Sequence, residues 1–338
     1  MRGRAYQVAI LYNLEDDVPR GDAHDLLAIQ YTANTTQYIY EALTALGYNT
    51  LRVAVRDSLT ELDQVLAGLS PDETFFFDNC DGFNGNNLAA VNVLRLVEER
   101  GFSHTGTTAK GTELCTDKVR AKERLMEFGI PTPAFQVFDR PEGELYLDFP
   151  VIVKPATEDA SMGIDLNSVA THPAALFESV RRVIEEYEQP AMVEQFIPGR
   201  ELAVAMWGNA PVTVLPIAEE DYSCISDPLQ RLLTFEAKWE PDSFYYKNIL
   251  ARCPATLFEE EEIRIQQVAI ATYNAMTLRD FGRVDIRYHQ GLPYVIDINE
   301  LPDLSPESGF WNSARAAGYQ YTEMIERILQ CALQREGW

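Results

Sequence analysis

The stretch from Phe281 to Phe310 constrains the fold most, because two runs of alternating apolar and polar residues flank a short glycine-containing break. Such alternation predicts a β-hairpin with one buried face and one polar face. The residues expected on the buried face are Val284, Ile286, Tyr288, Tyr294, Ile296 and Ile298.

The polar face of this hairpin would gather oxygen ligands. With a connection of three or five residues, Asp285 would lie across from Asp297, and Arg283 across from Asn299. Two facing carboxylates repel each other unless a cation lies between them, and Mg²⁺ prefers carboxylates together with substrate phosphates. The pattern therefore predicts a metal site. The alternative is an ordinary amphipathic hairpin whose polar face is solvated.

The length, net charge and composition of the chain limit the classes of function. The 338 residues suffice for two or three domains, and the net charge of −24 disfavours nucleic acid and anionic membrane as partners. No apolar run approaches the roughly 20 residues of a membrane span, and the N-terminal apolar run is too short for a signal peptide. Five scattered cysteines and four scattered histidines predict free thiols, a cytoplasmic location and no zinc site.

The first third of the chain alternates strand and helix patterns, which predicts an open α/β unit with a parallel sheet. Strands are expected at 6–12, 51–55 and 74–77, and helices at 31–46, 59–69 and 86–100. Ligands of such sheets bind beyond the carboxyl ends of the strands, here in the loops 13–28 and 78–87, although the second loop also reads as a plain surface turn. Neither a dinucleotide fingerprint nor a P-loop motif is present.

The middle of the chain carries charged residues beside apolar runs. A helix at 116–128 is expected to begin with Thr116 or Asp117 as its N-cap, and a buried strand at 151–153 delivers Lys154. A half-desolvated lysine favours an anionic partner, but Lys154 also fits a surface lysine whose stem alone is buried. Two acids, Glu194 and Glu201, flank a strand-to-strand turn, where they are either solvated or contact a nucleotide.

The remaining elements follow from the same patterns. A helix is expected at 171–188, strands at 191–196 and 202–207, a long helix at 257–277 and two short helices at 307–317 and 321–334. Residues 219–250 lack periodicity and carry Lys238 and Trp239, which predicts either disorder or a functional lid.

Four motifs stand in order between about residues 100 and 320: TDKVRAKERLMEFGIPTP, VIVKPATEDASMGI, VEQFIPGRELAV and GRVDIR…YVIDINELPDLSPES. Together they resemble the ATP-grasp superfamily and, within it, the D-alanine–D-alanine ligase family. The resemblance implies an N-terminal open parallel α/β domain (1–113), a central ATP-grasp subdomain (114–203) and a C-terminal catalytic domain (204–338). ATP would be gripped between the last two domains of this α/β (α+β ATP-grasp) fold.

For the nucleotide, the resemblance implies that Lys118 and Lys154 hold the α- and β-phosphates and that Lys238 covers the γ-phosphate. The other implied contacts are Ser161 in the phosphate loop, Glu194 at the adenine amino group, the backbone of Gln195 and Ile197 at the adenine edge, and Glu201 at the ribose.

For the chemistry, Asp285, Asp297 and Asn299 would hold two Mg²⁺ ions, with Mn²⁺ as an alternative. Arg283 would stabilise the tetrahedral intermediate and Ser308 would bind a substrate carboxylate. A carboxylate of one small-molecule substrate would attack the γ-phosphoryl group of ATP, and an amine would then displace phosphate from the acyl phosphate. The enzyme mainly positions the reactants and neutralises charge. Members of the family form homodimers.

The departures from the family pattern fall in the substrate parts. The phosphate loop, usually Glu-Gly-Ser-Ser-x-Gly, reads Glu-Asp-Ala-Ser-Met-Gly here. Asp159 thus stands at a glycine position and Ala160 at a serine position. Trp239 replaces the usual tyrosine and Asp297 the commoner glutamate, while Asp303 stands at a glycine whose N–H faces the developing oxyanion.

The N-terminal region departs further. The acid that recognises the ammonium group of the first substrate has no clear equivalent, and the candidates are Asp22, Asp25 and Asp81. We therefore predict an ATP-dependent amino-acid or peptide ligase with a non-standard substrate pair. The alternatives are the D-alanine–D-alanine ligase of peptidoglycan synthesis, a phosphoryl transfer without amide formation, and a catalytically silent ATP-binding protein.

Overall fold

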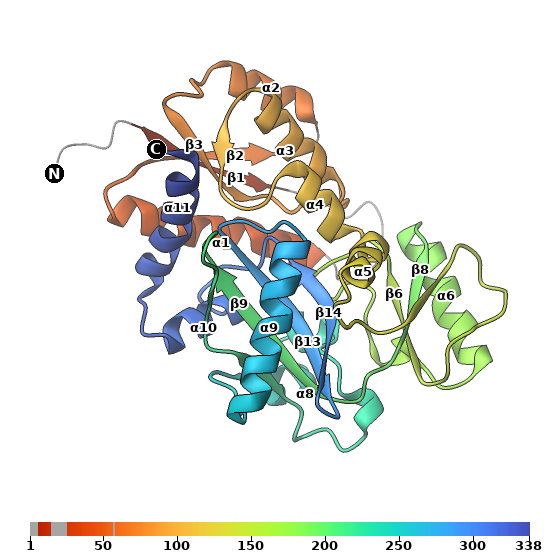
Figure 1. The fold of residues 1–338 in the computed structure, drawn as a ribbon. Helices are drawn as coiled ribbons and strands as arrows, with labels where there is room; N and C mark the ends of the chain where they lie inside the picture. The colour runs from red at the N-terminus through yellow and green to blue at the C-terminus, as the bar shows by residue number, and fades with distance from the viewer. Residues whose placement is uncertain (1–5, 15–25, 57) are drawn as a thin grey trace.

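The computed structural model describes residues 6–14, 26–56 and 58–338, and the side chains from residue 32 onward in the second range. The candidates Asp22 and Asp25 lie outside the described residues. Figure 1 shows an N-terminal unit at the top, a small unit at the right and a larger sheet unit in the middle, with the C-terminal helices beside the first unit.

The N-terminal unit is a parallel sheet in the order β2-β1-β3-β4, as predicted. Its strands are β1 (Gln7–Asn13), β2 (Asn49–Val55), β3 (Thr74–Asn79) and β4 (Ser103–His104), and its helices are α1 (Leu26–Ala45), α2 (Leu59–Ala67) and α3 (Ala89–Glu99). Alternation along β3 sends Phe75 and Phe77 toward α1 and Phe76 toward α2 and α3. The sheet is therefore covered on both faces, as parallel sheets require.

Two helices lead from this unit to the next one, α4 (Ala109–Thr116) and α5 (Lys118–Glu127). Of the two predicted N-caps, Asp117 caps α5: its side chain accepts hydrogen bonds from the backbone N–H groups of Val119 and Arg120. The cap fixes Lys118 at the first position of α5, facing inward.

The small unit is an antiparallel sheet in the order β5-β8-β6-β7, covered on one face by α6. Its elements are β5 (Phe135–Phe138), β6 (Val151–Pro155), a 3₁₀ turn (Leu166–Ser168), β7 (Val169–Ala170), α6 (Pro173–Tyr187) and β8 (Ala191–Gln195). Pro173 occupies the first turn of α6, where its missing N–H costs no helical hydrogen bond.

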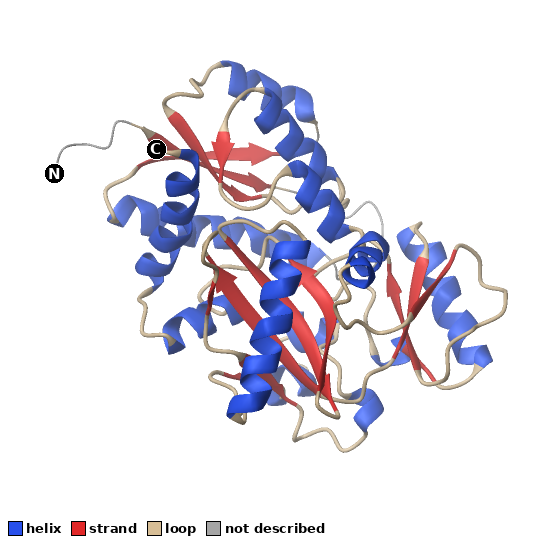
Figure 2. Cartoon of the chain, in the orientation of Figure 1, coloured by secondary structure: helices blue, strands red, loops and turns tan. Residues whose placement is uncertain are grey.

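The large sheet has the order β12-β11-β9-β13-β14, with β10 paired to β9. Its strands are β9 (Arg200–Trp207), β10 (Thr213–Val214), β11 (Ala218–Asp221), β12 (Leu250–Arg252), β13 (Phe281–His289) and β14 (Leu292–Asn299). One face packs on α9 (Glu259–Ala275), which crosses β9 and β13 in Figure 2. The predicted domain boundaries at residues 113 and 203 stay a prediction.

The central hairpin has the predicted pairing but reaches it differently. Asp285 pairs with Asp297 and Arg283 with Asn299, although the connection is only two residues, Gln290 and Gly291. A β-bulge at residue 296 supplies the missing residue and restores the register. The prediction of a three- or five-residue connection was wrong.

The bulge also changes which side chains are buried. Tyr294, Ile296 and Ile298 were expected in the core; Ile298 packs there, but Val295 takes the place of Tyr294 and Ile296. Ile296 lines the cleft on the opposite side of the hairpin. A strict alternation cannot hold across a bulge, because the extra residue shifts every preceding side chain to the other face.

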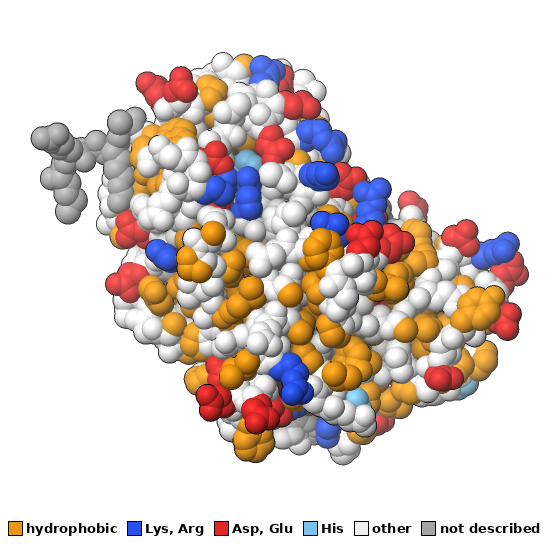
Figure 3. All heavy atoms as spheres, viewed as in Figure 1, with side chains coloured by type: hydrophobic (Ala, Val, Ile, Leu, Met, Phe, Trp, Pro, Cys, Tyr) orange, Lys and Arg blue, Asp and Glu red, His pale blue; other side chains and the backbone are white. Residues whose placement is uncertain are grey.

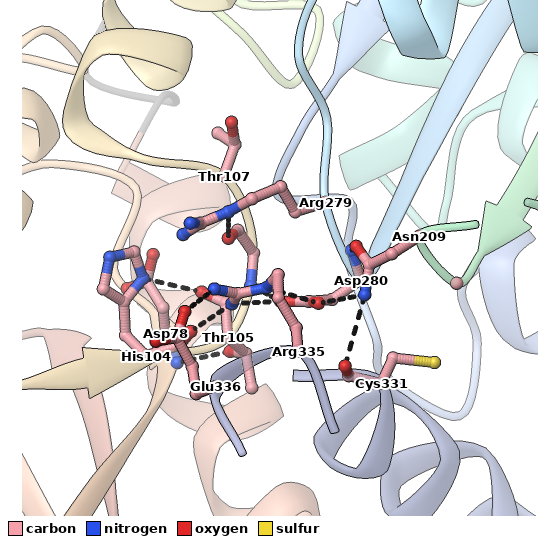
Figure 4. Close-up of polar contacts among 12 residues, drawn as sticks. Asp78, His104, Thr105, Thr107, Asn209, Arg279, Asp280, Cys331, Arg335 and Glu336 are labelled. Atoms are coloured by element: carbon pink, nitrogen blue, oxygen red, sulfur yellow. Dashed lines mark hydrogen bonds and ion pairs between the residues drawn. The ribbon is translucent and has the colours of Figure 1, made fainter. Parts of the chain in front are cut away.

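The C-terminal helices join the first unit to the large sheet. These are α10 (Gly309–Ala316) and α11 (Tyr321–Glu336), and α11 shares one buried core with α1, β1 and β3. Figure 4 shows the polar part of this joint: Arg335 of α11 binds Asp280, which is fully buried ahead of β13. Asn209 Nδ2 and the backbone N–H of Gly106 also donate to Asp280, so every oxygen of this carboxylate is satisfied.

No helix in the described ranges is long and apolar enough to cross a membrane. All five cysteines are free thiols. On the face shown in Figure 3, acidic and basic side chains are interspersed and no continuous basic area forms.

Candidate active site

A cleft of about 1080 Å³ opens where the three sheets meet, and residues of all three units line it. The predicted site residues that line this cleft are Lys118, Lys154, Ser161, Glu194, Gln195, Ile197, Glu201, Lys238, Arg283, Asp285, Asp297 and Asn299. Ser308 lies between two lining residues, Glu307 and Gly309. The fold thus brings together side chains that are up to about 180 positions apart in the sequence, as for Lys118 and Asp297. Their individual roles stay predictions.

Lys118 lies between two carboxylates. Its Nζ atom is 3.1 Å from Oδ1 of Asp159 in the phosphate loop and 3.2 Å from Oδ1 of Asp297 on β14. Burial alone would lower the pKa of Lys118, but the two acids outweigh burial and raise it. Burial in turn would raise the pKa of Asp297, and Lys118 and Lys154 instead lower it to about 2. Both groups are therefore charged at neutral pH.

Glu194 forms a second buried ion cluster at the end of β8. One of its oxygens is 2.7 Å from Nζ of Lys154, and the other contacts Nζ of Lys122. Lys122 also donates to Thr132 Oγ1 at 2.6 Å and to the carbonyl oxygen of Val295 at 3.1 Å. Burial would raise the pKa of Glu194, but the two lysines hold it below its usual range.

The sequence analysis gave Lys122 no role. The signal was its spacing of four residues from Lys118, which places both side chains on one face of α5.

Glu201 at the start of β9 is held by two donors. Arg287 Nη2 lies 2.6 Å from its Oε2 atom, and the Tyr222 hydroxyl donates to the same oxygen at 2.8 Å. Arg287 also donates to the carbonyl oxygens of Gly199 and Arg231. Glu201 is therefore fixed at the cleft wall, and its Oε1 atom has no hydrogen-bond partner among the residues described in the structure, so it can accept from a ligand hydroxyl.

The predicted metal ligands lie on one face of the hairpin. Arg283 binds both oxygens of Asp285, at 2.7 and 2.8 Å, and Asn299 Nδ2 donates to Asp285 at 3.1 Å. Asp285 and Asp297 face each other in the register, and the amide oxygen of Asn299 adds a third oxygen donor. Carboxylate and amide oxygens fit a hard divalent cation. Within the described ranges, no group of three or more His, Cys, Asp or Glu side chains could hold a metal, so the predicted site depends on the asparagine and on substrate oxygens.

The segment 219–250 is structured, and several of its residues line the cleft. It holds a 3₁₀ turn (Pro228–Gln230), α7 (Phe235–Trp239) and α8 (Phe244–Asn248) around a small core of Tyr222, Ile225, Ala237 and Ile249. Trp239 Nε1 donates to the carbonyl oxygen of Ala160 at 2.9 Å, and Ser161 Oγ donates to that of Leu233 at 2.8 Å. Of the two predictions for this segment, the arrangement favours a lid, and its contacts run to the phosphate loop.

Lys238 of α7 points into the cleft beneath this lid. Burial lowers the pKa of Lys238, and Arg283 lowers it further. The Arg283 guanidinium stays charged, because Asp285 and Asp297 outweigh its burial and raise its pKa.

Asp303, which the resemblance places where the family has the oxyanion glycine, lines the cleft, but both of its carboxylate oxygens are hydrogen-bonded within the protein. Its Oδ1 atom accepts hydrogen bonds from Thr35 Oγ1 at 3.1 Å and from the backbone N–H of Ser305 at 2.8 Å, and its Oδ2 atom accepts one from Ser305 Oγ at 2.8 Å. The carboxylate therefore ties α1 to the loop after β14. The Ser308 hydroxyl caps α10 by accepting from the backbone N–H of Trp311 at 3.1 Å, and its proton remains available to a substrate carboxylate.

The end of the cleft nearest the N-terminal unit is acidic. Asp78 and Asp81 line it there, and Asp303, which bonds to Thr35 of α1, lies nearby, whereas Glu300 lies close to Lys118, Asp159 and Asp297. Burial raises the pKa of Asp78 to about 7 and that of Glu300 to about 8. Of the candidates for the ammonium-binding acid, only Asp81 is described, and Thr32 Oγ1 donates to it at 3.0 Å.

Comparison with known proteins assigns this arrangement to a family. The family model described as D-ala D-ala ligase C-terminus matches residues 125–330. The chain belongs to the D-alanine–D-alanine ligase-like family of ATP-grasp enzymes. It is 31% identical to the D-alanine–D-alanine ligase of Alcanivorax borkumensis, over 71% of this chain and 72% of that protein. The ATP-dependent ligase class expected from the motifs is thereby confirmed.

Two further similar proteins match this chain over more of its length. An uncharacterized protein of Sinorhizobium fredii, y4sG, is 34% identical over 88% of this chain and 87% of its own length. The crystal structure of the D-alanine–D-alanine ligase of Bacillus anthracis, complexed with ATP, superposes with a TM-score of 0.75 over 96% of this chain and 97% of that one, at 19% identity. At that identity the superposition shows the fold, and it confirms the predicted ATP-grasp architecture.

Proposed function

We propose that this protein joins a carboxylate to an amine at the expense of ATP, through an acyl phosphate, with a substrate pair other than two D-alanine molecules. The observation that supports this proposal most directly is the hairpin register. It sets Asp285 opposite Asp297 in the same cleft as three lysines and Arg283. Cations and metal-binding acids at one site suit a polyphosphate substrate, whose charge the protein must neutralise locally.

Each group has a part in this reaction. Lys118 and Lys154 bind the α- and β-phosphates of ATP after leaving their present acid partners, and Lys238 covers the γ-phosphate from the lid. Glu194, Gln195 and Ile197 meet the adenine, Glu201 meets the ribose, and Ser161 donates to a phosphate oxygen. Asp285, Asp297 and Asn299 hold two divalent cations, which neutralise charge on the transferring phosphoryl group when bound.

The remaining groups act on the acyl half of the reaction. Arg283 donates to the oxygen that becomes negative when the amine attacks the acyl phosphate, and the backbone N–H at residue 303 completes that donor pair. Ser308 binds the carboxylate of the amine substrate. The lid excludes water, which would otherwise hydrolyse the acyl phosphate before the amine arrives.

A non-standard substrate pair is supported by the residues that touch the substrate half. Asp159 and Ala160 alter the loop that closes on the substrates, and the acidic end of the cleft adds negative charge. The D-alanine–D-alanine ligase activity is the second candidate, favoured by relatives at 26–31% identity that are D-alanine–D-alanine ligases. The intact acids of the hairpin count against a silent ATP-binding protein.

The test is phosphate release from Mg·ATP in the presence of D- and L-amino acids, singly and in pairs, with the masses of the products. Turnover by D-alanine alone, giving the dipeptide, would establish the second candidate instead. Turnover by another acid and amine would support the proposed function, and the product mass would name the bond formed. If none of the substrate pairs causes phosphate release, both candidates are excluded.

A further inference from the structure

Asp78 is a buried acid that the proposed reaction does not use. It is the fifth residue of β3 and follows three phenylalanines, at the carboxyl end of the parallel sheet. The residue is 4% exposed, and it lines the inner end of the cleft. Its side chain accepts one hydrogen bond, from the backbone N–H of Cys80 to Oδ1 at 3.1 Å. Among the described residues, Oδ2 has no hydrogen-bond partner.

Among the residues that the structure describes, no cation forms an ion pair with this carboxylate. The His104 ring lies nearby, but its Nδ1 atom is 2.9 Å from the carbonyl oxygen of Thr105 and its Nε2 atom 3.3 Å from Glu98. Figure 4 shows Arg279 and Arg335 in the same region, and their guanidinium groups bind the carbonyl oxygen of Gly106 and the carboxylate of Asp280. A buried carboxylate without a counter-ion is unfavourable, and its raised pKa reflects that cost.

The cleft that Asp78 lines also carries groups that suit an amphipathic chain. Ala90 and Leu94 of α3 supply apolar surface, and Thr112 of α4 supplies a hydroxyl group, all lining the same cleft. These residues are buried, so this part of the cleft is a deep inner extension. The Thr112 hydroxyl has no partner among the described residues. A methylene chain can contact apolar residues such as Ala90 and Leu94, and a terminal donor can bind Asp78, with the Thr112 hydroxyl as a second polar group of the same cleft.

The charge of the cleft points to the same class of group. Lys118 and Lys154, which line the same cleft, already have acid partners in Asp159, Asp297 and Glu194. A neutral or anionic side chain would leave the Asp78 carboxylate unpaired, whereas an ammonium or guanidinium group would form an ion pair with it in a low-dielectric setting.

We propose that the inner end of the cleft is a subsite for the cationic side chain of an amino-acid substrate, with Asp78 as its counter-ion and Thr112 as a further hydrogen-bond partner. This proposal rests on the proposed function and names the substrate class. The substrate is an amino acid whose aliphatic side chain ends in a primary ammonium or a guanidinium group. The α-amino and α-carboxylate groups remain in the main cleft, where the ligation takes place.

The experiment compares lysine, ornithine and arginine with norleucine, which has the chain of lysine without its ammonium group. Phosphate release from Mg·ATP is measured for each, in both stereoisomers and with a panel of amines and acids as second substrate. We expect at least a tenfold lower KM for one of the basic amino acids than for norleucine. Equal KM values for lysine and norleucine, or turnover confined to neutral substrates, would overturn the subsite while leaving the ligase function standing.

Three variants assign the preference to the pocket. Asp78→Asn keeps the shape and removes the charge, so it should raise the KM for the basic amino acid about tenfold and leave that for norleucine unchanged. Thr112→Val should raise the same KM by a smaller factor. Asp72→Asn, on an exposed acid, is the matched control and should change neither. Equal loss for both substrates in Asp78→Asn would indicate a structural role only.

Direct binding separates failure of this proposal from failure of the proposed function. Isothermal titration of the basic amino acid into the full chain, with Mg·ATP present, is repeated with Asp78→Asn. Binding that weakens in the variant would support the subsite even if no second substrate gives turnover. Absence of any binding difference between lysine and norleucine would overturn the subsite by itself.

Discussion

The Nζ atom of Lys118 lies 3.1 Å from Oδ1 of Asp159, so the ammonium group proposed to hold a phosphate of ATP is bound by a carboxylate of the phosphate loop itself. This acid stands where the family has glycine. If Lys118 binds a phosphate as proposed, ATP displaces Asp159 from Lys118, and the displaced carboxylate then lies near the phosphates.

Replacing Asp159 with glycine should therefore strengthen ATP binding. A partly exposed ion pair of this kind contributes up to about 1 kcal/mol, which corresponds to a roughly fivefold lower KM for ATP. Asp159→Asn is the matched control for charge alone and should give a similar decrease. Steady-state phosphate release at varied ATP is the measurement. A KM that rises in both variants would show that Asp159 assists nucleotide binding.

Asp297 is expected to be indispensable for turnover. Asp297→Asn removes one negative ligand of the proposed metal site and leaves the Lys118 ammonium without one of its two acids. We expect phosphate release to fall at least about 100-fold, because charge neutralisation at the transferring group is lost. Asp297→Glu keeps the ligand type and should retain activity. Near-wild-type turnover of Asp297→Asn would remove this residue from the site.

The lid should respond to nucleotide. Trp239 Nε1 joins the lid to the carbonyl oxygen of Ala160, and this loop is expected to bind phosphates. Trp239→Phe keeps an aromatic ring but removes the indole N–H and its hydrogen bond. The lid should therefore open more often and admit water to the acyl phosphate. We expect phosphate release to exceed amide formation in the variant, measured as the ratio of phosphate to product.

Limited proteolysis gives a separate measurement on the same segment. Cleavage within residues 219–250 should slow when Mg·ATP is added to the wild-type chain, and less so for Trp239→Phe. Cleavage at equal rates with and without nucleotide in the wild-type chain would count against a lid.

Secondary-structure elements could be predicted from the sequence better than contacts between distant residues. The alternation around Asp285 and Asp297 indicated the pairing, and Asp117 was recognisable as a cap, because both patterns are local. The bulge at residue 296 was not predictable, since alternation alone does not reveal an inserted residue. The short helices in residues 219–250 were missed because five-residue helices leave no usable period.

The sequence also did not predict contacts between residues that are distant along the chain. Glu194 was expected at the adenine, but its two lysine partners come from α5 and β6, and only the folded chain brings these together. Asp78 ends an apolar strand and was readable as a residue at the ligand edge of a parallel sheet. Its burial, at 4% exposed, was not predictable, because composition and spacing do not indicate what packs over it.

The last prediction concerns stability against pH. Burial raises the pKa of Asp78 from 3.8 to about 7, with His104 opposing the shift and Asp81 adding to it. Because the folded state holds this proton more tightly than the unfolded state, the neutral carboxyl stabilises the fold fully below about pH 4. That contribution is lost as pH rises through about 7, and it amounts to at most about 4 kcal/mol. The free energy of unfolding of the ligand-free protein should therefore fall between pH 5 and pH 8.

In Asp78→Asn this fall should be smaller, because the amide does not titrate. Part of the fall should remain, since burial also raises the pKa of Glu220 to about 7 and that of Glu300 to about 8. Urea unfolding at pH 5, 6, 7 and 8 measures the difference, and Asp72→Asn should follow the wild-type curve. If Asp78→Asn and the wild-type chain lose stability in parallel over this range, Asp78 is already ionised at pH 5 and its burial is compensated by the protein itself.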